Sequence, residues 1–391
     1  MNIYLKNIRN IAIISGIYLL LSKFFHYFFW EETIGPRLTY IFYAFIFIYG
    51  VINYKILMMS TDFYSKMVKY LVLIPFISIP VNMVFGSSTA IFGANVAAFT
   101  TFLLFVIFKK IDLTEKEIIV SLTILCCITL LIQIYQQYLY SIPVFGIRDE
   151  EFREEQRNGF YRFSVGTVML PVYCLYFYFC KYTESREKWT IPFIFAFAFS
   201  VYLFLTRQII LACLVTLAYS FLFFMKSNNK RNILFIALVA VFFLLSNFES
   251  IFGDFIHSYE EDQYTTDVRK EAIPYIIGES LDNIILTIFG HGRNAVVEDR
   301  FALRNVYLSD IGFVGQLYIY GVFWIAIFFC TLYKSIYKFR KILPLHLRMF
   351  FFCAFLHSIF FFPYATPDSM LIWTLALYIS SVYYNDYIKN T

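Results

Sequence analysis

Residues 201–215, VYLFLTRQIILACLV, place a single arginine inside a long apolar run. The run extends over residues 189–225, and Arg207 lies at its midpoint. A guanidinium at the centre of one spanning helix would cost several kcal/mol, about 3 or more. Because about 20 residues are enough to cross a bilayer, we predict two helices, 189–206 and 208–225, with Arg207 at the turn between them.

The composition of the whole chain is that of a membrane protein. Of its 391 residues, 60% are hydrophobic and 15% are charged, and the mean hydropathy is +0.66. A soluble domain of this length could not bury so much apolar surface. Lysine and arginine occur in short clusters between apolar runs, which argues against nucleic-acid binding. The seven cysteines lie within the apolar runs, so we expect neither a disulfide framework nor a Cys/His metal site, and no cofactor.

The apolar runs predict an all-α, polytopic membrane protein with about twelve transmembrane helices and one long outer loop. An even number of spans places both termini on the same side. The predicted spans are 11–30, 38–57, 68–86, 89–108, 117–140, 162–180, 189–206, 208–225, 232–248, 306–333, 347–362 and 369–387. The chain is thus divided into helices one to nine (1–248), a partly helical outer loop (249–305) and helices ten to twelve (306–391).

The distribution of basic residues predicts the orientation. With the N-terminus in the cytoplasm, the inner segments carry 20 of the 32 Lys and Arg residues and the outer segments carry 11, with Lys23 inside the first span. An excess of basic residues marks cytoplasmic loops, so both termini are predicted to be cytoplasmic and the turn at Arg207 to face outward.

Arginine and lysine are also divided between the two sides. The inner set contains 15 Lys and 5 Arg, whereas the outer set contains 10 Arg and one lysine, Lys270. Arginine binds phosphate and carboxylate groups through two parallel hydrogen bonds, which lysine cannot do. We therefore predict anion recognition on the outer side. Chance, or pairing of these arginines with local acids, is the alternative.

Two outer segments are long. The first, 141–161, contains RDEEFREEQRNGFYR, which continues to Arg162. Its first two arginines are spaced to pair with glutamates on a surface helix, whereas Arg157 and Arg162 flank an Asn-Gly turn next to the membrane and are better site candidates. The second, 249–305, has apolar residues at helical spacing, and we expect it to fold over the outer surface.

Within the second segment, DVRKEAIPYIIGESLDNIILTIFGHGRN predicts a helix that begins near Thr266 and ends in a glycine turn at 290–292. The later stretch RNVYLSDIGFVGQLYIYGVFW predicts the entry into span ten, with Asp310 about one turn inside it. Glu279 and Asp282 are expected to be solvated residues of the loop helix.

In topology and in three local patterns, the chain resembles the O-antigen polymerase and ligase superfamily (Wzy/WaaL-type). The patterns are a Thr206–Arg207 turn between two spans, Arg269 opening a helix that runs into Gly290-His291-Gly292, and SDIGFVGQLYIYG entering the next span. Ligases of the superfamily share a His-Asn pair just before that span. This chain has Arg304–Asn305 there, which favours a polymerase.

The resemblance implies a GT-C-like membrane fold and a metal-independent glycosyltransferase. Such an enzyme polymerises oligosaccharide repeat units of O-antigen, capsule or exopolysaccharide, carried on undecaprenyl pyrophosphate, at the outer face of the bacterial cytoplasmic membrane. The implied partners are the polyprenyl-pyrophosphate-linked glycan, the lipid bilayer, a chain-length regulator and a flippase. The alternatives are an O-antigen ligase-type transferase and a flippase or other transporter for the same lipid-linked glycan.

The residues that such chemistry needs are present on the predicted outer side. Fixed guanidinium groups stabilise the charge of a departing pyrophosphate, and the candidates are Arg207 and Arg269, followed by Arg157, Arg162 and Arg293. The acceptor hydroxyl needs a base, for which His291 and Asp310 are the candidates. The ordinary alternatives are a histidine in a surface turn and an acid favoured by a helix N-terminus or paired with an arginine.

Overall fold

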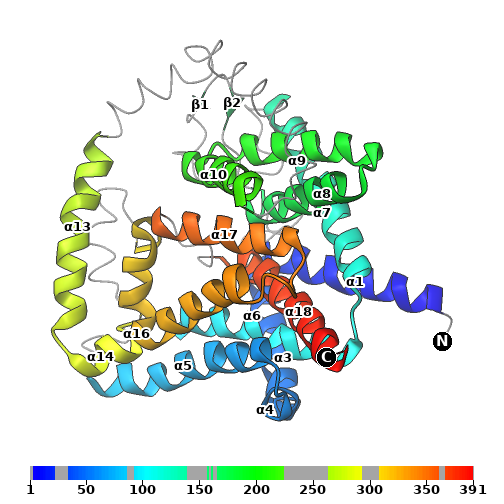
Figure 1. Ribbon diagram of the computed structural model, residues 1–391. Helices are drawn as coiled ribbons and strands as arrows, with labels where there is room; N and C mark the ends of the chain where they lie inside the picture. The colour runs from blue at the N-terminus through cyan, green and yellow to red at the C-terminus, as the bar shows by residue number, and fades with distance from the viewer. Residues whose placement is uncertain are drawn as a thin grey trace.

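The computed structural model describes residues 3–22, 34–85, 92–138, 156–157, 160–161, 165–223, 263–292, 308–360 and 366–390. Within these ranges every regular element is a helix except for two-residue strands β1 and β2, so the all-α prediction is confirmed there (Figure 1). The elements are α1 (Ile3–Leu21), α3 (Ile34–Ile52), α4 (Lys55–Met59), α5 (Phe63–Phe85), α6 (Phe92–Ile111), α7 (Glu115–Tyr138), β1 (Gln156–Arg157), β2 (Phe160–Tyr161), α8 (Met169–Ser185), η2 (Lys188–Thr190), α9 (Ile191–Leu203), α10 (Arg207–Phe223), α13 (Gln263–Leu281), α14 (Ile284–Phe289), η3 (Leu308–Ile311), α16 (Gly312–Tyr333), η4 (Lys334–Lys338), α17 (Leu345–Phe360) and α18 (Pro367–Asn390).

Each predicted span has a helix at its place except 232–248, which lies outside the described residues. The helix at the first predicted span, α1, begins at Ile3, eight residues before the apolar segment itself. Its first turns are polar but partnered: Lys6 lies 3.5 Å from Asp112, and the Asn10 amide donates to Glu117 at 3.0 Å. Because these polar side chains have partners, the helix extends beyond the N-terminal end of its apolar segment.

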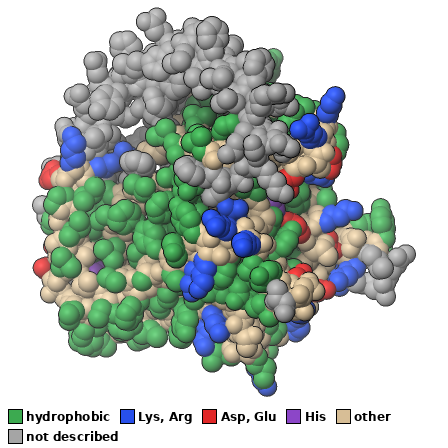
Figure 2. Space-filling model, viewed as in Figure 1, with side chains coloured by type: hydrophobic (Ala, Val, Ile, Leu, Met, Phe, Trp, Pro, Cys, Tyr) green, Lys and Arg blue, Asp and Glu red, His purple; other side chains and the backbone are tan. Residues whose placement is uncertain are grey.

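The described residues include three helices that are long and apolar enough to cross a membrane, Phe63–Phe85, Glu115–Tyr138 and Gly312–Lys338. Four shorter apolar helices of 10–17 residues accompany them, at Arg37–Ile52, Lys188–Leu203, Gln208–Leu222 and Leu345–Ile359. Figure 2 shows a broad expanse of hydrophobic side chains on the face formed by α5, α14 and α16. Such an exposed apolar surface, together with these helices, indicates membrane association.

Polar contacts join the helix ends into two groups. One group holds the start of α1 and the end of α18, and we call it the termini end. There Asn10 of α1 bonds Glu117 at the start of α7, and the Tyr378 hydroxyl of α18 donates to the Leu113 carbonyl at 2.9 Å. The α6–α7 connection thus lies beside both chain ends.

The opposite group, which we call the glycine-turn end, holds the other ends of the same helices. The Thr167 hydroxyl, just before α8, lies 2.5 Å from that of Ser369 in the first turn of α18. The Asn82 amide of α5 donates to the Gly290 carbonyl at 2.9 Å. Figure 1 shows α13 along this edge of the molecule, across the direction of α5 and α16.

The predicted single helix from Thr266 to the glycine turn is wrong, because two helices occupy this segment. Helix α13 ends at Leu281 and α14 begins at Ile284. Asn283 separates them: its extended backbone stops α13, and its side-chain oxygen accepts hydrogen bonds from the backbone N–H groups of Ile285 (3.0 Å) and Leu286 (3.4 Å). Asparagine is among the best residues for capping a helix in this way.

Candidate functional site

The turn that contains Arg207 is formed as predicted. Helix α9 ends at Leu203, and α10 begins at Arg207 itself. Between them Leu205 adopts a left-handed backbone conformation (φ 51°), which reverses the chain. The interpretation of the 189–225 run as two helices is therefore confirmed, although the side chain of Arg207 lies outside the described residues.

The strands β1 and β2 form an antiparallel pair in which Arg157 is opposite Phe160. This register leaves Asn158 and Gly159 between the strands, the dipeptide most typical of a two-residue hairpin. The Phe160 ring packs edge-on against Tyr202 in the last turn of α9, with the centroids 5.8 Å apart. The strand pair that contains Arg157 therefore packs against the last turn of α9.

Arg269 lies in the second turn of α13. One row of this helix is buried, at Val268, Ala272, Ile276 and Ser280, and Arg269 is next to that row and partly buried. Its Nε atom is buried and has no hydrogen-bond partner among the described residues. A buried guanidinium N–H without an acceptor is costly, so binding of an anionic ligand at this nitrogen would be favourable.

The glycine turn packs against a break in α16. Gly321 interrupts that helix with φ 79° and ψ 172°, so the backbone is unwound at this point. The N–H groups of His291 and Gly292 donate to the carbonyls of Tyr318 (2.7 Å) and Ile319 (3.1 Å). The turn thereby supplies hydrogen bonds that an unbroken α16 would have made within itself.

The imidazole of His291 lies in a defined environment. It stacks on the Tyr318 ring with the centroids 4.6 Å apart and 11° between the planes. Its Nε2 atom makes a long contact, 3.5 Å, with the Ser280 carbonyl. Burial lowers the pKa of His291 below its ordinary value, and the Ser280 carbonyl and the carboxylates of Glu279 and Asp282 only partly oppose this. Burial therefore favours the neutral form of His291.

Asn82, on α5, holds the glycine turn from the other side. Its amide nitrogen donates to the carbonyls of Gly290 and Ser78, both at 2.9 Å. These two carbonyl acceptors fix the orientation of the Asn82 amide. In the flipped orientation the side-chain oxygen of Asn82 would face the two carbonyl oxygens, with no proton between them. The side-chain oxygen of Asn82 is buried and has no partner among the described residues.

Asp310 lies before α16 and not one turn inside it, so that prediction is wrong. It belongs to the short helix η3, and α16 begins at Gly312, where φ is +57°. A side chain at Gly312 would overlap the Ile359 carbonyl, so the close approach of α17 fixes this start. The side chain of Asp310 lies outside the described residues.

The described contacts bring some predicted site residues together and leave others apart. The strand pair that contains Arg157 packs through Phe160 on the last turn of α9, the helix that precedes the Arg207 turn. The other distances follow from a helical rise of about 1.5 Å per residue. Asp310 is roughly 12 Å along the chain from Tyr318, the residue on which His291 stacks. Arg269 is roughly 16 Å along α13 from Ser280, the residue whose carbonyl His291 contacts. Arg162 and Arg293 lie outside the described residues.

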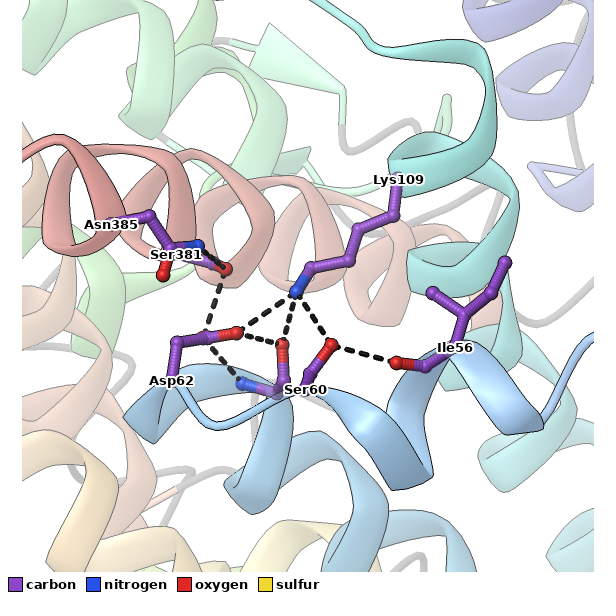
Figure 3. Close-up of polar contacts among 7 residues, drawn as sticks. Ile56, Ser60, Asp62, Lys109, Ser381 and Asn385 are labelled. Atoms are coloured by element: carbon purple, nitrogen blue, oxygen red, sulfur yellow. Dashed lines mark hydrogen bonds and ion pairs between the residues drawn. The ribbon is translucent and has the colours of Figure 1, made fainter. Parts of the chain in front are cut away.

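A second polar cluster, which the sequence did not predict, lies at the termini end (Figure 3). Asp62, before α5, accepts hydrogen bonds from the Lys109 ammonium, the Ser65 backbone N–H and the Ser381 hydroxyl, all at 2.9 Å. The Ser65 hydroxyl donates to Oδ2 of Asp62, the same carboxylate oxygen that accepts from Lys109. Lys109 also donates to Ser60 at 3.2 Å.

The Asp62–Lys109 cluster is a structural ion pair. Burial by itself would raise the pKa of Asp62, but the hydrogen bonds from Ser65 and Lys109 outweigh it and the pKa is lowered. Both carboxylate oxygens are used, and the partners come from α5, α6 and α18. The pair therefore ties three segments together and leaves no open position for a ligand.

The sequence contained weak signals for the residues that were missed. Asn82 is an amide in an apolar helix, and polar residues in such places usually have a specific partner. Gly321 lies in the middle of a predicted span, but a single glycine is usually tolerated within a helix. Neither signal indicates which distant segment the residue contacts.

No family model, curated protein or solved structure matches the chain. Function is therefore inferred from the residues and their arrangement.

Proposed function

We propose that this protein polymerises polyprenyl-pyrophosphate-linked oligosaccharide repeat units at the outer face of the bacterial cytoplasmic membrane. The observation that carries the proposal is the turn between α9 and α10, which begins α10 at Arg207, with the strand pair that contains Arg157 packed through Phe160 on the last turn of α9. Both arginines belong to the set predicted to bind pyrophosphate. The segments that they occupy are 50 residues apart and are joined by the contact of Phe160 with Tyr202.

The proposed topology has about twelve spans in a GT-C-like arrangement, with both termini in the cytoplasm. It is supported by the two groups of helix ends. The termini end contains Lys6, Lys109 and Lys334, which belong to the lysine-rich inner set, and α9 ends on the other side with the Arg207 turn. Arginines for anion binding and lysines for orientation are thus at opposite ends of the helices.

In the proposed reaction, an acceptor hydroxyl oxygen attacks the anomeric carbon of a second lipid-linked glycan. The bond between that carbon and the pyrophosphate oxygen breaks, and polyprenyl pyrophosphate leaves with the electron pair. Guanidinium groups at the α9–α10 corner bind the growing negative charge through paired hydrogen bonds. The hydroxyl proton passes to a base.

His291 is the preferred base. A carbonyl oxygen only accepts hydrogen bonds, so the contact with Ser280 places the imidazole proton on Nε2 and the lone pair on Nδ1. The lowered pKa of His291 keeps that lone pair available at neutral pH. Gly290 and Gly292, with positive φ on both sides of it, form the tight turn that holds the imidazole in place. Asp310 is the second candidate.

A flippase for the same lipid-linked glycan is the second candidate function, and the break in α16 favours it. Transporters often use interrupted helices, whose free backbone groups contact the substrate. In this chain the Tyr318 and Ile319 carbonyls at the break are already bonded by the glycine turn, which makes the break less available for substrate. A ligase remains less favoured because Arg304–Asn305 replaces the expected His-Asn pair.

A host strain that lacks the gene distinguishes these functions. If the protein is a polymerase, single repeat units accumulate on the lipid carrier at the outer face, and the ladder of longer glycans disappears. A ligase defect leaves long glycans on the lipid carrier. A flippase defect leaves lipid-linked single units that added impermeant glycosidase cannot reach in intact spheroplasts. Either of the last two patterns would remove the polymerase proposal.

A further inference from the structure

Five basic side chains form one surface at the termini end, which we call the η4 basic patch. It consists of Lys66 on α5, Lys334 and Lys338 on η4, and Arg340 and Lys341 after it. All except Lys334 are exposed, and Lys334 is partly exposed. Residues 334–338 form a π-helix, which is uncommon and is frequently found at functional sites.

Packing between distant segments creates this patch. The Lys334 ammonium lies 4.3 Å from the centre of the Phe63 ring, and that ring packs against Phe339 at 5.2 Å. The Tyr64 hydroxyl lies 3.1 Å from that of Ser335. Because Lys66 is three residues after Phe63, it lies on the same face of α5, so α5 and η4 present their charges together.

The charge of the patch is not balanced by acids in the described part of the chain. None of its five side chains has a carboxylate within 4.0 Å there. Asp62 is close in sequence to Lys66, but it is buried and paired with Lys109. Asp386 follows Tyr384, which packs on Phe339, but two residues along a helix point to roughly opposite faces.

Exposed tyrosines indicate how deep in the membrane the patch lies relative to the expanse of exposed hydrophobic side chains, which we call the apolar belt. Tyr333 and Tyr337, which alternate with Lys334 and Lys338, are 62% and 46% exposed. Tyrosine is enriched where a protein surface crosses from hydrocarbon to headgroups. Figure 2 shows a group of Lys and Arg side chains at the border of the hydrophobic expanse. The patch therefore lies at headgroup depth.

We propose that the η4 basic patch binds the headgroups of anionic phospholipids in the inner leaflet. The ammonium and guanidinium groups match the phosphate charge, and the neighbouring tyrosines and the apolar belt match the glycerol and acyl chains. Orientation of the protein in the membrane requires only an excess of basic residues on this side. It does not require that these residues lie together on one surface.

The test measures lipid retained by the purified protein in native mass spectrometry, after exchange into mixed detergent micelles that contain phosphatidylglycerol and phosphatidylcholine. Basic residues near an anionic surface contribute about fivefold each to binding. We expect Lys338→Gln/Lys341→Gln to lower the preference for phosphatidylglycerol about tenfold or more. Added salt should lower the wild-type preference in the same direction.

The matched control is Lys181→Gln/Lys188→Gln, which removes the same charge from another inner segment, where Lys181 is already paired with Glu187 at 3.3 Å. It should keep the wild-type preference. An unchanged preference in the patch variant, or an equal loss in the control, would overturn the proposal. Competition by millimolar inorganic phosphate would overturn the assignment to lipid and indicate a free-phosphate site. Melting temperatures in phosphatidylcholine micelles check that all variants are folded.

Discussion

Gly290 and Gly321 are in direct backbone contact, although one lies in a turn and the other in the middle of a helix. A side chain on Gly290 would overlap the Ile319 carbonyl, and one on Gly321 would overlap the Ile288 carbonyl. Both residues have positive φ, 88° and 79°. The glycine turn and the break in α16 are therefore one packed unit, and neither can accept a Cβ without moving the other.

Gly321→Ala should destabilise the protein by at least about 2 kcal/mol, because a backbone with φ 79° and ψ 172° is essentially restricted to glycine, costs other residues about 1–3 kcal/mol, and the overlap adds to it. The measurement is thermal unfolding in detergent. Gly278→Ala is the matched control: it lies in α13, nothing is within 4 Å of its added Cβ, and alanine favours helix. Equal melting temperatures for the two variants would contradict the described contact.

Arg207→Lys should reduce polymer formation severely while leaving the protein inserted and abundant, since lysine keeps the charge but loses the paired hydrogen bonds. Arg207→Ala should do at least as much harm, and Arg269→Ala should resemble it. The assay is long-chain glycan made from lipid-linked repeat units, with membrane protein level measured in parallel. Arg186→Lys, in the connection between α8 and α9 at the other end of the helices, is the control. Normal polymerisation by Arg207→Lys at normal abundance would leave Arg207 as a topological charge only.

If His291 is the base, polymerisation should persist as the pH falls through 6.5, the ordinary histidine pKa, and decline only at lower pH, because burial lowers the pKa of this group. Glu279→Gln and Asp282→Asn remove charges that raise the pKa, so each should move the decline to still lower pH. The pH profile of the rate at saturating substrate measures this. A shift toward higher pH in either variant contradicts the assignment.

Asn82→Ala should impair the same reaction by releasing the Gly290 carbonyl, and its signature should be a lower turnover rate with little change in KM. Asn82→Asp lacks the amide donor and should not restore the rate, whereas Asn82→Gln should restore part of it. Loss of the folded protein in Asn82→Ala, seen as a collapse of its melting temperature, would show a structural role instead.

Asp62→Asn should be strongly destabilising, by about 3–5 kcal/mol, because it leaves the Lys109 ammonium without its counter-ion in a buried site. The double variant Asp62→Asn/Lys109→Met should recover much of this loss, and a double-mutant cycle on unfolding free energy measures the coupling. The lowered pKa of Asp62 means that its stabilising effect is complete above its ordinary value of 3.8 and is lost as the pH falls through the lower folded value.

Several features of this protein follow from the sequence alone. The length of the 189–225 run, set against the length that a bilayer needs, predicted two helices with Arg207 at the turn. Asn158–Gly159 predicted a chain reversal, and the strands on either side of it are paired antiparallel. The glycines at 290 and 292 predicted the end of a helix. These are local properties, because they depend on hydropathy, backbone freedom and hydrogen bonds between near neighbours in the chain.

Only the tertiary structure decided which of these local elements meet. The contact of Asn82 with Gly290, the packing of the glycine turn on the break at Gly321, the Asp62–Lys109 pair and the contact of Phe160 with Tyr202 each join segments that are distant in sequence. The same apolar patterns are compatible with many pairings of helix ends. The pairing is selected by close backbone approach and by the need of buried polar groups for partners, and both depend on atoms that lie far away along the chain.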